Sequence, residues 1–164
     1  MPIFDSHSFE FFSRSPEQTR RVGMRLGALL LVGDLVCLSG DLGAGKTTLV
    51  QGMAQGWGSL DPVSSPTFVL VNMYRRPDRT ALMHLDAYRL QNALEAEDLD
   101  LVLMFETGAT VVEWPERIES ALPSERIWVK MSWMTDEHRV MVFTPTGNRN
   151  EHLLAKFRRQ ILGG

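Results

Sequence analysis

Residues 40–47 read Gly-Asp-Leu-Gly-Ala-Gly-Lys-Thr and fit the phosphate-binding pattern G-x-x-x-x-G-K-[ST] without a mismatch. Glycines in such a loop let the backbone turn where a Cβ would clash, so that successive N–H groups point inward and form a nest for an anion. A helix that follows the loop directs the positive end of its dipole at the same anion. The pattern therefore predicts a site for the phosphates of ATP, with GTP less favoured, together with Mg²⁺.

Two side chains of this loop have direct roles in the predicted chemistry. The ammonium of Lys46 is expected to reach the β- and γ-phosphates, and the hydroxyl of Thr47 is expected to ligate Mg²⁺. An apolar stretch, residues 35–38, precedes the loop, and a helical pattern over residues 47–57 follows it. This strand–loop–helix context favours a phosphate site over an ordinary glycine-rich turn.

Two acidic residues follow apolar strand candidates elsewhere in the chain. Asp86 comes directly after residues 81–85, and Glu113 comes directly after residues 109–112. A phosphate loop needs an acid at the end of a neighbouring strand, which holds the metal directly or through water. Because such strand ends lie at the ligand-binding edge of an open α/β sheet, we expect both acids to face the phosphates. Periodicity does not say which one binds the metal and which one orients water.

A further candidate, Thr67, lies in the Ser65-Pro66-Thr67 loop that follows the phosphate-loop helix. Switch-like segments of P-loop enzymes often occupy this place, where a threonine can reach the γ-phosphate or the metal. A plain turn explains the same residues equally well, because proline and serine favour turns.

The remaining elements must position these residues. We expect an edge strand at 9–12 and an amphipathic helix capped by Ser15 that ends near Gly33. Two strand pairs are expected at 68–74 with 80–85 and at 127–133 with 139–143, and helices are expected at 94–105, 114–122 and 151–162. This order predicts a single domain over residues 1–164 with an α/β, three-layer P-loop NTPase fold. Its central sheet is expected to be mixed and mostly parallel, with an antiparallel part.

Composition excludes several classes of protein. A formal net charge of −3 argues against nucleic-acid binding through bulk electrostatics. The single cysteine, Cys37, excludes a disulfide framework and indicates a reducing compartment. Apolar runs are too short for a membrane span, and the acidic N-terminus is unlike a signal peptide. We therefore expect a cytoplasmic protein.

In combination, the motifs resemble the bacterial TsaE (YjeE) family of P-loop ATPases, which takes part in making threonylcarbamoyladenosine at position 37 of tRNAs. They are the phosphate loop extended to Thr48, Ser65-Pro66-Thr67-Phe68, His84-Leu85-Asp86-Ala87-Tyr88-Arg89-Leu90 and Val112-Glu113-Trp114-Pro115. Their order and gaps match the family over residues 15–139. The resemblance implies weak, Mg²⁺-dependent ATP hydrolysis that matters only with the threonylcarbamoyl transferase and its paralogous partner subunit. It leaves direct contact with tRNA open.

The resemblance also implies roles for individual residues. Asp86 would lie beside the γ-phosphate and orient or deprotonate water, with Lys46 as the second catalytic residue. Thr47 and Glu113 would hold Mg²⁺; Glu113 departs from the commoner Asp, and its longer side chain can compensate. The implied nucleotide-binding residues are Thr19 beside the adenine, then Leu42, Gly43, Ala44, Gly45, Lys46, Thr47, Thr48, Thr67 and Trp114.

Three other interpretations use the same loop. A regulatory GTPase is poorly supported because the chain has no N-K-x-D motif and no D-x-x-G motif after the loop. A nucleotide or small-molecule kinase would use Arg75, Arg76 and Arg79 as a lid over the transferred phosphoryl group. A nucleotide-sensing scaffold without useful hydrolysis would share every phosphate-binding residue.

Overall fold

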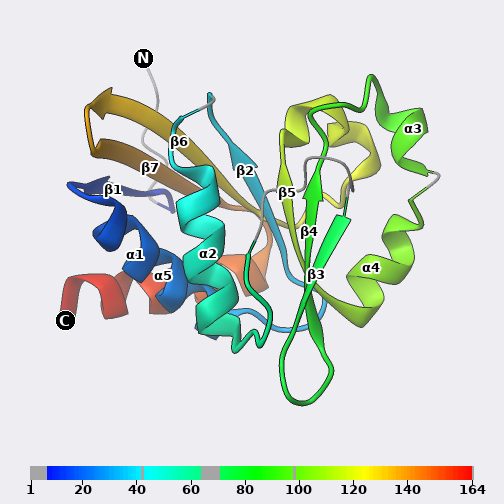
Figure 1. Cartoon of the computed structure of the whole chain (residues 1–164), viewed down its shortest axis with the longest axis horizontal. Helices are drawn as coiled ribbons and strands as arrows, with labels where there is room; N and C mark the ends of the chain where they lie inside the picture. Colours follow the sequence, from blue (N-terminus) through cyan, green and yellow to red (C-terminus); the bar gives the residue numbers. More distant parts are fainter. Residues whose placement is uncertain (1–6, 42, 64–70, 98, 164) are drawn as a thin grey trace.

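The computed structural model of the chain describes residues 7–41, 43–63, 71–97 and 99–163. Within them, one sheet contains the strands in the order β1-β7-β6-β2-β5-β4-β3 (Figure 1). Their bounds are β1 Phe9–Ser13, β2 Leu35–Ser39, β3 Val71–Arg75, β4 Ala81–Asp86, β5 Gly108–Glu113, β6 Ile127–Thr135 and β7 His138–Pro145. Strands β6, β2, β5 and β4 run parallel, whereas β7, β1 and β3 each pair antiparallel with a neighbour. The predicted mixed, mostly parallel sheet is confirmed.

Helices cover both faces of this sheet, which confirms the predicted three-layer α/β P-loop NTPase fold. On one face lie α1 (Pro16–Leu29), α2 (Lys46–Trp57) and α5 (Asn148–Gly163); on the other lie α3 (Ala93–Glu97), α4 (Leu101–Thr107) and the 3-10 turns η1 (Pro115–Arg117) and η2 (Glu119–Ala121) (Figure 1). Strand β2 shows how the sequence produces the layers. Val36 and Leu38 pack into the first core, while Leu35 and Cys37 alternate into the second. A strand buried on both faces must be apolar along its length.

Helices α1 and α2 approach each other at backbone distance. A Cβ added at Gly27 of α1 would lie 2.0 Å from the carbonyl oxygen of Met53, and one added at Gly56 of α2 would lie 1.9 Å from that of Met24. Gly23 and Gly52 are enclosed in the same way. Hence α2, which begins at the phosphate loop, is packed against α1 without intervening side chains.

Two predicted helices differ from the structure. The expected helix over 94–105 is divided into α3 and α4, because Asp100 takes a left-handed backbone conformation with φ 52° and caps α4 by accepting from the Leu103 N–H. The expected helix over 114–122 consists of the 3-10 turns η1 and η2. By contrast, the predicted cap of α1 is confirmed: Ser15 Oγ accepts from the Gln18 N–H at 3.1 Å.

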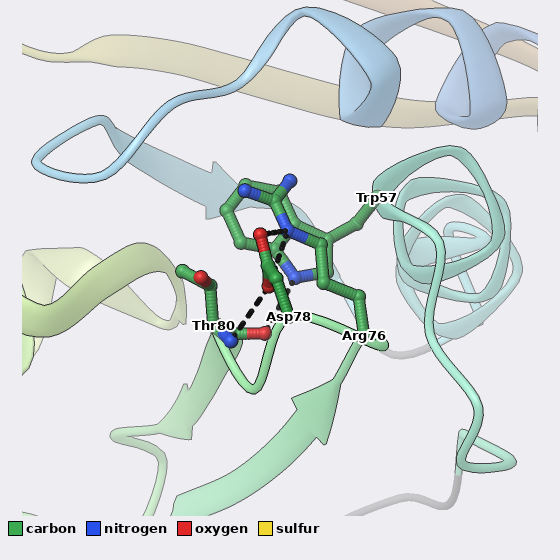
Figure 2. Close-up of polar contacts among 4 residues, drawn as sticks. All are labelled: Trp57, Arg76, Asp78 and Thr80. Atoms are coloured by element: carbon green, nitrogen blue, oxygen red, sulfur yellow. Dashed lines mark hydrogen bonds and ion pairs between the residues drawn. The ribbon is translucent and has the colours of Figure 1, made fainter.

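The turn between β3 and β4 is attached to the C-terminal end of α2 (Figure 2). The guanidinium of Arg76 lies 3.9 Å from the centroid of the Trp57 ring and donates to the Asp78 carboxylate at 3.1 Å. Asp78 also accepts from the Thr80 N–H at 2.8 Å. This turn precedes β4, whereas Asp86 is the last residue of β4. The turn and Asp86 therefore lie at opposite ends of that strand.

Candidate nucleotide-binding site

The candidate site lies at the edge where the parallel strands end. In the register of the sheet, Glu113 on β5 is paired with Asp86 on β4 and with Leu38 on β2, the strand that enters the phosphate loop. The two acids predicted from their positions after apolar strands are therefore neighbours across adjacent strands. One cavity brings them together with the loop, and its lining comprises Gly43, Gly45, Lys46, Thr47, Thr48, Asp86, Glu113, Trp114 and Arg139.

Glycines give the loop its shape at two positions. Gly45 has φ 96° and caps the N-terminus of α2, a backbone conformation that residues with a Cβ rarely adopt. Gly40 has φ 146°, and a Cβ there would lie 2.5 Å from the carbonyl oxygen of Met131 on β6. The loop thus passes directly against β6 before α2 begins, with the helix N-terminus facing the cavity.

Lys46 extends from the first turn of α2 and is almost fully buried. Its Nζ donates to the carbonyl oxygen of Gly40 at 2.6 Å and lies 4.0 Å from the centroid of the Trp114 ring. Burial lowers the pKa of Lys46, while the nearby charges of Glu113 and Asp86 oppose that shift. The positive charge of this ammonium at the loop can attract a phosphate.

Asp86 is half-buried at the end of β4, and its Oδ1 accepts from the Tyr88 N–H at 2.9 Å. Burial raises the pKa of Asp86, and the charge of Glu113 raises it further, although the Tyr88 hydrogen bond acts in the opposite direction. A carboxylate with a raised pKa next to a phosphate-binding loop is suited to accept a proton from, or to orient, an attacking water.

Glu113 is held by a histidine that the sequence analysis did not assign a role. Its Oε2 accepts from His84 Nε2 at 2.6 Å, and His84 Nδ1 is hydrogen-bonded to the hydroxyl of Tyr74 at 2.9 Å. All three side chains are buried, with 6%, 1% and 2% exposure for Glu113, His84 and Tyr74. A buried carboxylate is tolerated here because it has a hydrogen-bond donor as a partner.

Arg139, near the start of β7, also lines the cavity, although a nucleotide contact from it was doubtful on the sequence alone. Its Nη1 donates to the carbonyl oxygens of Asp136 at 2.6 Å and of His138 at 3.0 Å, which orients the guanidinium from the β6–β7 turn. Its Nε is buried and has no hydrogen-bond partner among the described residues. The atom lies 3.8 Å from where a Cβ on Gly45 would be. An unsatisfied cationic donor beside the loop fits an anion in this cavity.

The other predicted residues fall into three groups. Thr47 and Thr48 line the cavity with Lys46, and Ala44 lies within the loop, where its N–H donates to the Asp41 carbonyl at 3.1 Å. Thr19 does not line the cavity: it is buried in α1, and its hydroxyl is hydrogen-bonded to Ser13 Oγ at 2.6 Å. Leu42 and Thr67 lie outside the described residues.

The oxygen donors at the cavity suit Mg²⁺ bound together with phosphates. Thr47 offers a hydroxyl and Glu113 offers a carboxylate. In the part of the chain that the structure describes, no three His, Cys, Asp or Glu side chains form a group that could hold a metal alone. Mg²⁺ does not require such a group, because it is commonly held by one or two carboxylates, substrate phosphates and water.

The mixed sheet, with its phosphate loop between β2 and α2, places the protein in the class with the P-loop NTPase fold. The sequence profile of the family described as "Threonylcarbamoyl adenosine biosynthesis protein TsaE" matches residues 13–141. The chain belongs to this family, which is involved in the biosynthesis of threonylcarbamoyladenosine in tRNA.

Individual relatives agree with this assignment. The chain is 39% identical over 146 residues to the "tRNA threonylcarbamoyladenosine biosynthesis protein TsaE" of Bacillus subtilis strain 168, covering 88% of this chain and 90% of that protein. It is 43% identical over 136 residues to the TsaE protein of Streptomyces coelicolor, covering 79% and 92%. The crystal structure of Bacillus subtilis YdiB superimposes with a TM-score of 0.78 at 32% identity, over 93% of this chain and 95% of that chain.

Among the described residues, no helix is both long enough and apolar enough to cross a membrane.

Proposed function

We propose that this chain binds ATP with Mg²⁺ in the cavity at the phosphate loop and hydrolyses it slowly. We further propose that the hydrolysis serves threonylcarbamoyladenosine formation at position 37 of tRNAs, in a complex with the threonylcarbamoyl transferase and its paralogous partner subunit. The observation that carries the proposal is the single cavity lined by Lys46, Asp86 and Glu113, which come from three separate elements. Membership of the TsaE family supplies the link to tRNA modification.

Each residue would have a distinct part in this reaction. Lys46 and Arg139 would bind the phosphates with their cationic donors, and the amides of the loop would complete the cradle. Thr47 and Glu113 would hold Mg²⁺, which when bound neutralises charge on the phosphate oxygens. Asp86 would orient water or take its proton, because it is an acid with a raised pKa at the same cavity.

The kinase alternative loses its proposed lid in this structure. Arg76 is stacked on Trp57 and paired with Asp78 at the edge of the sheet opposite to the phosphate loop. Arg75 ends β3 at the same distant turn, and Arg79 lies within that turn. Arg139, rather than these three arginines, is the one that lines the cavity.

ATP turnover measured with and without the purified transferase, its partner subunit and tRNA tests the proposal. We expect slow turnover by the chain alone and strong stimulation by the complete mixture. Lys46→Ala provides the matched control, since it removes the ammonium that would bind phosphate. Unchanged ATP affinity of Lys46→Ala in calorimetry would show that the nucleotide does not bind at this loop. Phosphorylation of a small acceptor without the other proteins would instead favour a kinase.

A further inference from the structure

A chain of buried polar side chains runs across three neighbouring strands and ends at the candidate site. Tyr74 lies on β3, His84 on β4 and Glu113 on β5. Leu82 lies two residues before His84, and Val111 lies two residues before Glu113, so each pair shares one face of the sheet. Leu82 and Val111 belong to the core beneath α2, so the three polar side chains lie on that face. Burying three polar groups in an apolar core costs desolvation free energy unless each group is hydrogen-bonded to its neighbour.

With Glu113 ionised and His84 neutral, one arrangement of protons satisfies all three side chains. A carboxylate only accepts, so the 2.6 Å contact with Glu113 Oε2 requires a proton on His84 Nε2. In a neutral imidazole, Nδ1 then accepts, and the Tyr74 hydroxyl at 2.9 Å donates to it. Asn72 is hydrogen-bonded to Tyr74 as well, which lets the tyrosine oxygen accept while its O–H donates. Tyr74 thereby selects the tautomer of His84 that donates to Glu113.

We propose that His84, set in this tautomer by Tyr74, is a positioning residue that holds Oε2 of Glu113 so that the other carboxylate oxygen meets Mg²⁺. The proposal rests on the function proposed above, because it requires Glu113 to be a metal ligand. His84 is not itself one of the residues that line the cavity, and its hydrogen bond to the lining is the one to Glu113. Fixing the carboxylate before the metal arrives removes the freedom of a long side chain that binding would otherwise have to restrict.

The experiment compares ATP affinity by calorimetry in Mg²⁺ and in EDTA, and the ratio of the two affinities measures the contribution of the metal. His84→Asn places an amide near the position of Nδ1 and removes the donor to Glu113, whereas His84→Gln places an amide nitrogen near Nε2. We expect His84→Asn to lower the ratio by about 10–100-fold, as for other groups that orient a metal ligand, and His84→Gln to restore most of it. Tyr74→Phe should cause a smaller loss in the same direction.

Thr110→Val is the matched control. Thr110 lies three residues before Glu113 on β5, is fully buried, and has a hydroxyl without a hydrogen-bond partner among the described residues. The change alters a buried side chain of the same strand and should leave the ratio unchanged. If His84→Asn does not fold, Tyr74→Phe is compared with Thr110→Val. Only Tyr74→Phe removes a hydrogen bond of the series from Tyr74 through His84 to Glu113, so this comparison decides the question.

The outcomes separate this inference from the proposed function. If Glu113→Ala lowers the ratio but His84→Asn and Tyr74→Phe do not, the positioning role is wrong and the metal site stands. If Glu113→Ala leaves the ratio unchanged, Glu113 is not a metal ligand, so the positioning role of His84 fails, while ATP binding and hydrolysis at the cavity are still tested by Lys46→Ala and by turnover. Equal losses in His84→Asn, His84→Gln and Thr110→Val would indicate a general packing defect and would also overturn the positioning role.

Discussion

The ammonium of Lys46 lies 4.0 Å from the centroid of the Trp114 ring, so the lysine of the phosphate loop rests on the aromatic residue that directly follows Glu113. Trp114 has φ 58° and ψ 47°, a left-handed conformation that is uncommon for a bulky residue. The turn that this conformation makes brings the indole over Lys46. Strained backbone of this kind is typically found where a side chain must be aimed at a functional site.

Trp114 should therefore report the binding of nucleotide. A bound phosphate would compete for Lys46, so Mg²⁺ and ATP are expected to change tryptophan fluorescence as the ammonium leaves the ring. The change should disappear in Trp114→Phe and persist in Trp57→Phe, because Trp57 packs on Arg76 at the opposite edge of the sheet. A titration that gives the same signal in Trp114→Phe would place the nucleotide elsewhere.

Asp86→Asn should separate binding from hydrolysis. Asn keeps an oxygen for the Tyr88 N–H but cannot accept a proton from water. We expect ATP affinity to change little and turnover to fall by about 10²–10⁴-fold, the usual contribution of a general base. Turnover at the wild-type rate, measured as phosphate release, would exclude Asp86 from catalysis.

The same variant should show a pH-dependent gain in stability. Because the pKa of Asp86 is raised in the fold, the native protein binds this proton more tightly than the unfolded chain, and ionisation penalises the native state. Asp86→Asn should raise the melting temperature at about pH 7, where the carboxyl is ionised. The gain should fade as the pH falls through the raised pKa towards the ordinary value of 3.8. A gain that is independent of pH would contradict this assignment.

Arg139→Ala and Arg76→Ala form a matched pair. Arg139 has an unsatisfied Nε at the cavity, so its loss should weaken ATP binding by about tenfold, in keeping with a charged hydrogen bond. Arg76→Ala should leave ATP affinity unchanged and cost about 0.5–1 kcal/mol of stability through the lost contact with Trp57. Calorimetry measures the ATP affinity of each variant, and thermal melting measures its stability. A loss of ATP affinity in Arg76→Ala but not in Arg139→Ala would instead support an arginine lid from the β3–β4 turn.

Gly27→Ala should be destabilising although alanine favours helices. The added methyl group would lie 2.0 Å from the Met53 carbonyl oxygen, and forcing α1 and α2 apart is expected to cost about 1–3 kcal/mol or more. Gly163→Ala, at the end of α5, has no heavy atom within 4 Å of the new Cβ and should be neutral or slightly stabilising. Chemical denaturation measures both, and equal stabilities would show that the helices separate freely.

Cys37 should be inert in the folded protein. Burial raises the pKa of its thiol to about 12, and the side chain is fully enclosed in β2. Because the thiolate is the reactive form, alkylating reagents at about pH 8 should modify Cys37 only as fast as the chain unfolds. Rapid labelling of the native protein, followed by mass spectrometry, would contradict the packing of this strand.

Much of the site could be predicted because its residues are defined by local pattern. The phosphate loop follows an apolar strand, and Asp86 and Glu113 each end one, so parallel pairing alone brings them to one edge. Arg139 could not be found in this way. It reaches the loop only because β7 returns antiparallel beside β6, which passes Gly40, and that approach depends on tertiary pairing rather than on neighbouring residues.

The same distinction explains the errors in the fold. The helix predicted over 94–105 has a suitable apolar pattern, but Asp100 adopts a left-handed conformation that propensity does not reveal, and it starts a new helix there. The hydrogen bonds from Tyr74 through His84 to Glu113 were equally hidden, since they join three strands whose register only the sheet establishes.

The contact of α1 with α2 through glycines also has a mechanical consequence. Helices separated by side chains can slide or rotate as rotamers change, but backbones in direct contact have no such compliant layer between them. We therefore expect α1 and α2 to move together. A displacement of the phosphate loop, which leads into α2, would then be expected to shift α1 as well.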